Sequence, residues 1–164
     1  MPNGDQEQIR ALLLNPRESL DVELKQWLDP QTAEGKAKFV KAFIALRNNN
    51  GGMLVVGIKN DGSPDMENRP SDIRGTFHQD IVQGLVGKYA SAQFEVTVEF
   101  LERDNLEYPV IRVPNGVTTP VACKSELKDA AGRVLLKPDT VYVRSLNSNN
   151  TVSSAPAYQG VVGC

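Results

Sequence analysis

Few residue types in this chain could carry out chemistry. The 164 residues include one histidine, His78, and two cysteines, Cys123 and Cys164, without CxxC spacing. This composition excludes a zinc ribbon, argues against a disulfide framework and weakens Ser-His-Asp or Cys-His mechanisms. His78 itself is expected to begin a helix rather than to act as a ligand or base. We therefore expect any chemistry to use carboxylates, lysines, a metal or backbone amides.

Such groups gather in three segments, which are Glu18 to Lys25 (ESLDVELK), Asn48 to Asp61 (NNNGGMLVVGIKND) and Tyr142 to Ser154 (YVRSLNSNNTVSS). Each segment also has a plain structural interpretation. Glu23 and Lys25 could be a solvated surface pair, and Asp61 could be only a turn residue. Gly51-Gly52 either ends a helix or lets a phosphate approach backbone N–H groups. The segment is not a P-loop, because no Lys-Ser/Thr follows the glycines.

Glu18 and Glu23 are five residues apart, so their relative position depends on the backbone between them. On an unbroken strand, an odd separation places two side chains on opposite faces. On a helix, at about 100° per residue, they would point roughly 140° apart. The two carboxylates can therefore meet only if the chain bends between Ser19 and Asp21, and the preceding Pro16 favours such a bend.

Helical patterns surround these segments. Asp5 to Leu14 and Phe77 to Ala90 show apolar residues at helical spacing. The strongest helix runs through KAKFVKAFIALRNNN, with Asp29-Pro30 as its expected start and NNNGG as its end. Its expected buried stripe is Phe39, Val40, Phe43 and Ile44, with Lys38 and Lys41 on the opposite side.

The remaining patterned segments predict strands at 21–28, 53–58, 93–102, 108–113, 121–127 and 140–144. In 21–28, alternation places Asp21, Glu23, Lys25 and Trp27 on a charged outer face. The apolar run 53–58 predicts a strand buried on both faces. About six strands and about three helices, mixed in order, predict an α+β fold with a mixed β-sheet. We expect one domain over residues 1–154 and a flexible tail over 155–164.

Overall charge does not identify a partner. The net charge is −2, which gives no global basic field for nucleic acid. The distribution is uneven, since residues 61–110 hold 4 Lys/Arg and 10 Asp/Glu, whereas residues 111–164 hold 6 and 3. A polyanion would therefore bind a local patch in the last third. No apolar run approaches the ~20 residues that span a bilayer, and the polar start MPNGDQEQ is unlike a signal peptide, so we expect a cytoplasmic chain with no membrane association.

Taken in order, the three segments resemble the AlbA-like domain of the Schlafen family, often described as a DNA-binding or divergent ATP-binding domain. The family pattern runs E-S-x-x-[LV]-E-[FL]-K, then a helix, then A-F-x-N-x-x-GG-x-[LI]-x-x-G-[IV]-x-[DN]-x-G, and closes with Tyr-[IV]-Arg and a Ser-rich turn. The matching residues are Glu18-Ser19, Val22 to Lys25, Ala42-Phe43, Asn48, Gly51-Gly52, Gly57-Ile58, Asn60 to Gly62 and Tyr142 to Ser145. The resemblance covers residues 14–154.

The resemblance implies a site for nucleic-acid chemistry. The family includes endoribonucleases that cleave structured RNA such as tRNA, through two glutamates of the first element and an aspartate after the G-[IV] strand. Residue by residue, these positions are Glu18, Glu23 and Asp61, with Asn60 as the neighbouring candidate for the third. Three carboxylates can hold one or two Mg²⁺ or Mn²⁺ ions, which stabilise a phosphoryl transition state and activate the nucleophile.

Contacts to RNA or DNA are expected in the same segments and in the basic last third of the chain. The candidates are Lys25, Asn48, Gly51, Gly52, Lys124, Lys128, Arg144 and Ser145. Lysine and arginine would neutralise phosphates, and hydroxyl and amide groups would bind phosphate oxygens. For Arg144 the alternative is an ion pair with a neighbouring carboxylate.

Three functional hypotheses follow. The first is a metal-dependent nuclease acting on RNA or single-stranded nucleic acid, and the presence of the E-S-x-x-x-E element favours it slightly. The second is a non-catalytic DNA-, RNA- or nucleotide-binding module, which could belong to a longer regulator. The third is a purely structural assembly domain. In relatives, two such lobes pair within one chain, so a homodimer is the corresponding expectation for this single lobe.

Overall fold

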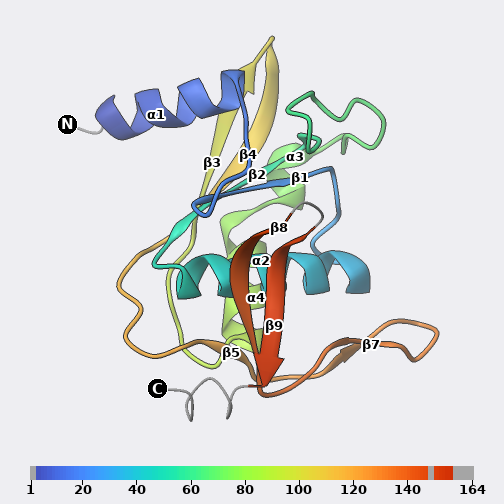
Figure 1. The fold of residues 1–164 in the computed structure, drawn as a ribbon. Helices are drawn as coiled ribbons and strands as arrows, with labels where there is room; N and C mark the ends of the chain where they lie inside the picture. The colour runs from blue at the N-terminus through green and yellow to red at the C-terminus, as the bar shows by residue number, and fades with distance from the viewer. Residues whose placement is uncertain (1–2, 148–149, 157–164) are drawn as a thin grey trace.

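The computed structural model describes residues 3–147 and 150–156. Within these ranges the helices are α1 (Asn3–Leu14), α2 (Ala33–Asn48), the four-residue α3 (Ile73–Thr76) and α4 (Gln79–Tyr89). They combine with a mixed four-stranded sheet and two smaller sheets, so the predicted α+β class is confirmed (Figure 1). His78 caps α4 by accepting a hydrogen bond from the Asp80 N–H at 3.1 Å, as expected for a residue that begins a helix.

The main sheet has the strand order β1-β2-β4-β3. Its strands are β1 (Val22–Lys25), β2 (Gly52–Val56), β3 (Thr97–Arg103) and β4 (Leu106–Val113). β1 and β2 run parallel with Glu23 opposite Leu54, and the other two pairings are antiparallel. The parallel pair requires a crossover, and α2 forms it.

The last third of the described chain forms the smaller sheets. Their strands are β5 (Ala122–Cys123), β6 (Leu127–Lys128), β7 (Val134–Leu136), β8 (Thr140–Asn147) and β9 (Asn150–Pro156). β8 lies between β5 and β9, and β6 pairs with β7. β9 extends to residue 156, so an ordered strand reaches into the range expected to be a tail; the rest of that range lies outside the described residues.

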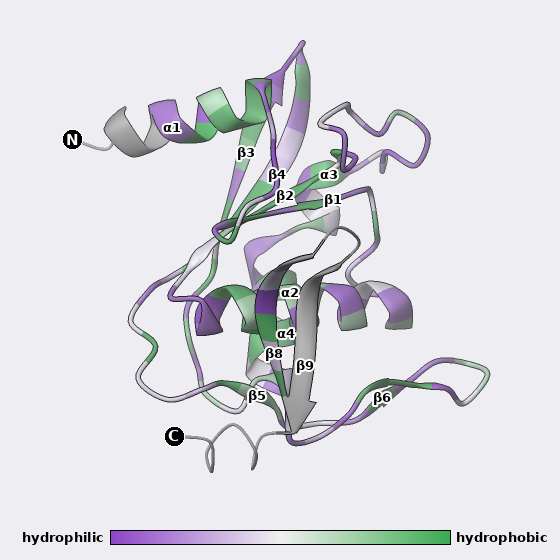
Figure 2. Ribbon diagram, viewed as in Figure 1, coloured by the Kyte–Doolittle hydropathy of each residue, from purple (hydrophilic) through white to green (hydrophobic). Residues whose placement is uncertain are grey.

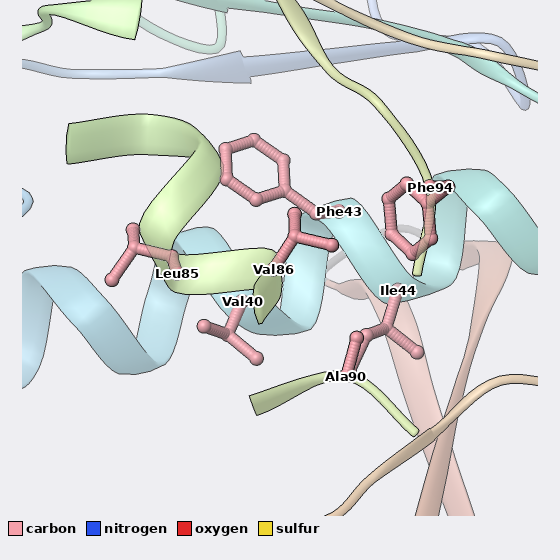
Figure 3. A pocket seen from close by; sticks show the side chains of 7 residues that line it. All are labelled: Val40, Phe43, Ile44, Leu85, Val86, Ala90 and Phe94. Carbon is pink, nitrogen blue, oxygen red and sulfur yellow. The ribbon is translucent and has the colours of Figure 1, made fainter. Parts of the chain in front are cut away.

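α2 forms the centre of the core and packs against β8, β2 and α4. The expected stripe is confirmed, since Phe39, Val40, Phe43 and Ile44 are each at most 2% exposed. Figure 3 shows Val40, Phe43 and Ile44 against Leu85, Val86, Ala90 and Phe94, in a seam that leaves no space for a water-sized molecule. The buried surface is wider than a stripe, because Ala37, Ala42, Ala45 and Leu46 are buried as well.

The predicted start of α2 is wrong by three residues. Thr32, not Asp29, is the N-cap, and its hydroxyl accepts a hydrogen bond from the Gly35 N–H at 3.0 Å. Asp29 instead closes a preceding turn by accepting from the Gln31 N–H at 2.9 Å. Both residue types cap helices well, so the sequence pattern could not decide between them.

The predicted charged outer face of the first strand is also wrong. Glu23 is 2% exposed and Trp27 is 6% exposed, so both faces of this strand are covered. Trp27 stacks on Tyr108 and donates its indole N–H to the Asp65 carbonyl oxygen at 2.8 Å. Asp65 comes from the long loop between β2 and α3, whose residues are mostly hydrophilic in Figure 2. Tertiary contacts from β8 and from this loop therefore override the alternation.

Candidate functional site

A tight turn brings the two glutamates of the ESLDVELK segment together. Ser19 and Val22 exchange backbone hydrogen bonds, with N···O distances of 3.0 and 3.3 Å, around the turn residues Leu20 and Asp21. The turn reverses the chain, so the Glu18 carboxylate folds back and accepts from the Leu24 N–H at 3.4 Å. The predicted bend between Ser19 and Asp21 is confirmed, and the Glu18 and Glu23 carboxyl groups are within hydrogen-bonding range of each other.

Glu23 is a buried anion held between two cations. One carboxylate oxygen accepts from the Arg144 guanidinium, and the other lies 2.9 Å from the Lys25 ammonium nitrogen. The side chains of Glu23 and Arg144 are 3% and 1% exposed, while Lys25 is 24% exposed. A buried carboxylate needs such partners because it has lost its hydration. The solvated-pair interpretation of Glu23 and Lys25 therefore does not hold.

Besides its contact with Glu23, Arg144 also binds the turn formed by residues 19–22. Its guanidinium donates to the carbonyl oxygens of Ser19 at 2.5 Å, Val22 at 2.9 Å and Leu20 at 3.3 Å. This set connects β8 to the turn that precedes β1. Arg144 therefore forms the ion pair that was its alternative interpretation, and its donors are directed inward to protein oxygens.

The carboxyl group of Glu18 has a raised pKa. Burial raises the pKa of its carboxyl group above the ordinary value of 4.5, and the neighbouring Glu23 charge raises the pKa further. Like charges at close range disfavour simultaneous ionisation of two carboxyl groups. Arg144 and Lys25 stabilise the charged form of Glu23, so Glu18 is the more easily protonated member of the pair.

Asp61 does not join the two glutamates in a three-carboxylate group. It lies in the exposed turn after β2, where its carboxylate accepts from the Ser63 N–H at 2.9 Å and the Ser63 hydroxyl at 2.6 Å. These hydrogen bonds lower the pKa of Asp61. Throughout the part of the chain that the structure describes, no three His, Cys, Asp or Glu side chains are placed to hold a metal. With Glu23 occupied by Arg144 and Lys25, the residues as arranged do not fit the expected Mg²⁺ or Mn²⁺ site.

Asn48 and the two glycines have structural roles at the end of α2. The Asn48 amide donates to the carbonyl oxygens of Val121 and Tyr142, both at 2.9 Å, and accepts from the Val121 N–H at 2.7 Å. Gly51 has φ +96°, and a Cβ there would lie 2.9 Å from the Asn115 nitrogen. A Cβ on Gly52 would overlap the Asp21 carbonyl oxygen. The glycines thus allow close backbone packing, and a nucleic-acid contact at these residues stays a prediction.

The other basic-region candidates lie on the smaller sheets. Lys124 is exposed just after β5, and Lys128 is exposed on β6, 3.6 Å from Glu126. Ser145 is half-buried on β8 next to Arg144. Their contacts with nucleic acid also stay predictions.

Sequence reasoning missed one residue of this region. Lys41 was expected on the outer side of α2, but its ammonium lies 5.7 Å from the centroid of the Tyr142 ring. β8 covers this side of α2, and only the tertiary fold brings β8 there. The helical pattern of α2 contains no signal for that contact.

Matches to the chain include one family model and two solved structures. The family model described as Schlafen, AlbA_2 matches residues 18–153. No curated protein shows significant sequence similarity to the chain. The crystal structure of the DIP2311 protein from Corynebacterium diphtheriae matches with a TM-score of 0.52 and 16% identity, over 93% of this chain and 27% of that one. The N-terminal domain of a RecG-related protein from Nitrosomonas europaea matches with a TM-score of 0.47 and 18% identity, over 73% of this chain and 77% of that one.

The likeness to the DIP2311 protein, at 16% identity, shows the fold alone, and this chain spans only about a quarter of the length of that protein. In the described ranges, the helices are too short or too polar to cross a membrane.

Proposed function

Because the chain belongs to the Schlafen AlbA_2 family, we propose that it binds nucleic acid and cleaves RNA at the Glu18–Glu23 carboxyl pair. The observation that carries this proposal is the pairing itself. A turn brings together two glutamates that a regular strand or helix would separate, and Arg144 and Lys25 fix one of them in its charged form. Structured RNA such as tRNA is the proposed substrate class.

Glu18 is the member of the pair that can move a proton at a phosphodiester, because both Glu23 carboxylate oxygens are held by cations. Cleavage of RNA requires a base that takes the proton of the attacking hydroxyl and an acid that protonates the leaving oxygen. Glu18 is half-buried, and burial and the neighbouring Glu23 charge raise its pKa, so it is the member of the pair proposed to act as the acid. Glu23 is the ionised partner, and Lys25, which is partly exposed, is a cation that can face the phosphate.

The dependence of cleavage on a divalent cation can be tested in the same assay. The described carboxylates do not form a three-ligand group, so no step is assigned to a metal. Cleavage that requires Mn²⁺ and is abolished by EDTA would indicate that Glu23 leaves its cation partners when substrate binds. Cleavage that persists in EDTA would support the acid–base pair alone.

The decisive experiment compares the parent chain with Glu18→Gln and with Glu102→Gln, using tRNA and single-stranded DNA. Glu102 is an exposed glutamate on β3, so its substitution is a matched control for the loss of one carboxyl group. We expect cleavage of tRNA by the parent and by the control. We expect a loss of about 10²-fold or more in Glu18→Gln, since positioned acid–base groups contribute that much. Equal cleavage rates in all three proteins would contradict the assignment.

The second candidate function is a non-catalytic binding module. Both Glu23 carboxylate oxygens are already occupied by Arg144 and Lys25, as in a structural ion-pair network, and this observation favours it. It predicts a gel shift of RNA or DNA with no cleavage under any metal condition. In that case Glu18→Gln should leave binding unchanged.

A further inference from the structure

Lys41 is a half-buried lysine held against the last third of the chain. It lies on α2, on the side that packs against β8. Its ammonium nitrogen is 5.7 Å from the centroid of the Tyr142 ring, a distance at which the ring face attracts a cation. Tyr142 is itself 6% exposed, so this contact fixes the position of Lys41.

In the described part of the chain, cations surround Lys41. Its cationic neighbours are Lys25 and Lys38, and burial followed by the repulsion of these two cations lowers the pKa of Lys41, while the Cys123 thiol has a smaller, opposing effect. Lys25 is paired with Glu23 at 2.9 Å, and Lys38 with Glu34 at 3.0 Å. Among the described residues, no carboxylate pairs with Lys41. A cation that has lost part of its hydration is unfavourable unless an anion approaches it.

Lys41 also lies beside the carboxyl pair. Tyr142 and Arg144 are two residues apart on β8, so their side chains emerge on the same face at a spacing of about 7 Å. Arg144 contacts Glu23, and Tyr142 contacts Lys41. Lys25 connects the two, since it pairs with Glu23 and is also a charged neighbour of Lys41.

From this arrangement we propose that Lys41, flanked by Lys25 and Lys38, is a phosphate-binding site that holds a backbone phosphate of the nucleic acid next to the Glu18–Glu23 pair. The phosphate site stands on the cation cluster, and its assignment to nucleic acid rests on the proposed function. A bound phosphate supplies the missing counter-charge and accepts hydrogen bonds from the ammonium groups. The charge distribution along the sequence predicted phosphate binding in the last third of the chain, whereas Lys41, which has no carboxylate partner among the described residues, lies on α2.

The test measures binding of a fluorescein-labelled single-stranded RNA to the parent chain, Lys41→Gln, Lys41→Arg and Lys36→Gln at several salt concentrations. Lys36 is a lysine of the same helix with comparable exposure, and it is not among the charged neighbours of Lys41, so it is the matched control. We expect Lys41→Gln to weaken binding about tenfold and to reduce the slope of log affinity against log salt by about one. Lys41→Arg should retain most of the affinity, and Lys36→Gln should bind like the parent.

A second measurement separates the phosphate site from the nucleic-acid function. Inorganic phosphate is titrated into protein with isotope-labelled lysines, and the NMR signal of the Lys41 side chain is followed. A phosphate-dependent shift of that signal with no RNA binding by the parent would support the site and overturn the nucleic-acid assignment. If Lys41→Gln, folded by circular dichroism, binds RNA as tightly as Lys36→Gln and phosphate shifts no Lys41 signal, the proposal is overturned.

Discussion

Glu23 and Arg144 form the buried ion pair on which the local structure depends. Arg144 also accounts for three carbonyl oxygens of the turn before β1, so one side chain satisfies four acceptor groups. Removal of one member of a buried pair leaves the other charged and without its partner, which costs more than removal of both. A comparison of single and double variants therefore measures how strongly Glu23 and Arg144 stabilise each other in the folded protein.

We expect Arg144→Met to lower the free energy of unfolding by about 3–5 kcal/mol, because Glu23 stays buried next to Lys25 alone. The double variant Glu23→Leu/Arg144→Met should recover more than half of that loss. Urea denaturation of the two single variants and the double variant measures the coupling between the residues. Strictly additive losses would show that the two side chains do not stabilise each other.

The pH dependence of stability reports on Glu18. Its folded-state pKa is raised, so between pH 4.5 and the folded pKa the native state binds more protons than the unfolded state, and stability falls as pH rises. Glu18→Gln removes this penalty. We expect the variant to match the parent in stability at low pH and to exceed it increasingly above about pH 4.5. Thermal unfolding across pH measures this difference, and a constant difference would contradict a raised pKa.

At the scale of elements, α2 determines the core and also carries the proposed phosphate site. Its apolar residues pack against β2, α4 and β8, so the same helix fixes the distance between the main sheet and the smaller sheet. At the β3 edge of the main sheet, side chains of α4 make hydrogen bonds with the backbone as a neighbouring strand would. Gln79 and Gln83 each donate to and accept from the backbone of residues 94–98, with distances of 2.6–2.9 Å. These amides satisfy backbone groups that would otherwise lack partners at the edge.

We expect Phe43→Ala to lower the free energy of unfolding by about 3–5 kcal/mol, as for a fully buried ring whose neighbours cannot close the cavity. Phe43 is 1% exposed and packs with Phe39 at a ring-centroid distance of 6.0 Å. Chemical denaturation gives the value. A loss below about 1 kcal/mol would show that α2 and α4 can move together to fill the space.

At the scale of the whole molecule, charge separates along the chain. Residues 61–110 are strongly acidic and residues 111–164 are basic, while the proposed site combines cations from β1 and α2 with Arg144 from β8. Nucleic acid is therefore expected to approach from the side of β8 and to avoid the acidic middle segment. A homodimer stays a prediction, and light scattering after size-exclusion chromatography measures it.

The double variant Lys124→Ala/Lys128→Ala tests whether the contact extends along the last third of the chain. Each lysine that neutralises a phosphate releases counterions, so its loss weakens binding most at low salt. We expect weaker RNA binding and a salt slope reduced by about two. If the variant retains the affinity of the parent at every salt concentration, the contact surface is confined to the cluster around Lys41 and Lys25.

Local sequence patterns were enough to predict the α+β class, the buried stripe of α2, the helix-start role of His78 and the requirement for a bend between Ser19 and Asp21. These features depend on residues near one another in the chain, where helical spacing, capping side chains and turn residues act locally. The family pattern also selected Glu18 and Glu23 as candidate site residues, because it is written in residue types at fixed spacing.

The surroundings of these residues depend on contacts with segments that are distant in the sequence. Glu23 alternates in the sequence like an exposed residue, yet Arg144, which is 121 residues away, covers it. Lys41 follows the helical pattern of an outer residue, yet β8 lies over it. Asp61 was expected to complete a three-carboxylate group with the glutamates, yet in the described residues no such group forms, and the Asp61 carboxylate accepts hydrogen bonds within its own turn. In each case the outcome depends on which distant segment packs against the residue, and that is fixed by burial of the whole core rather than by any local pattern.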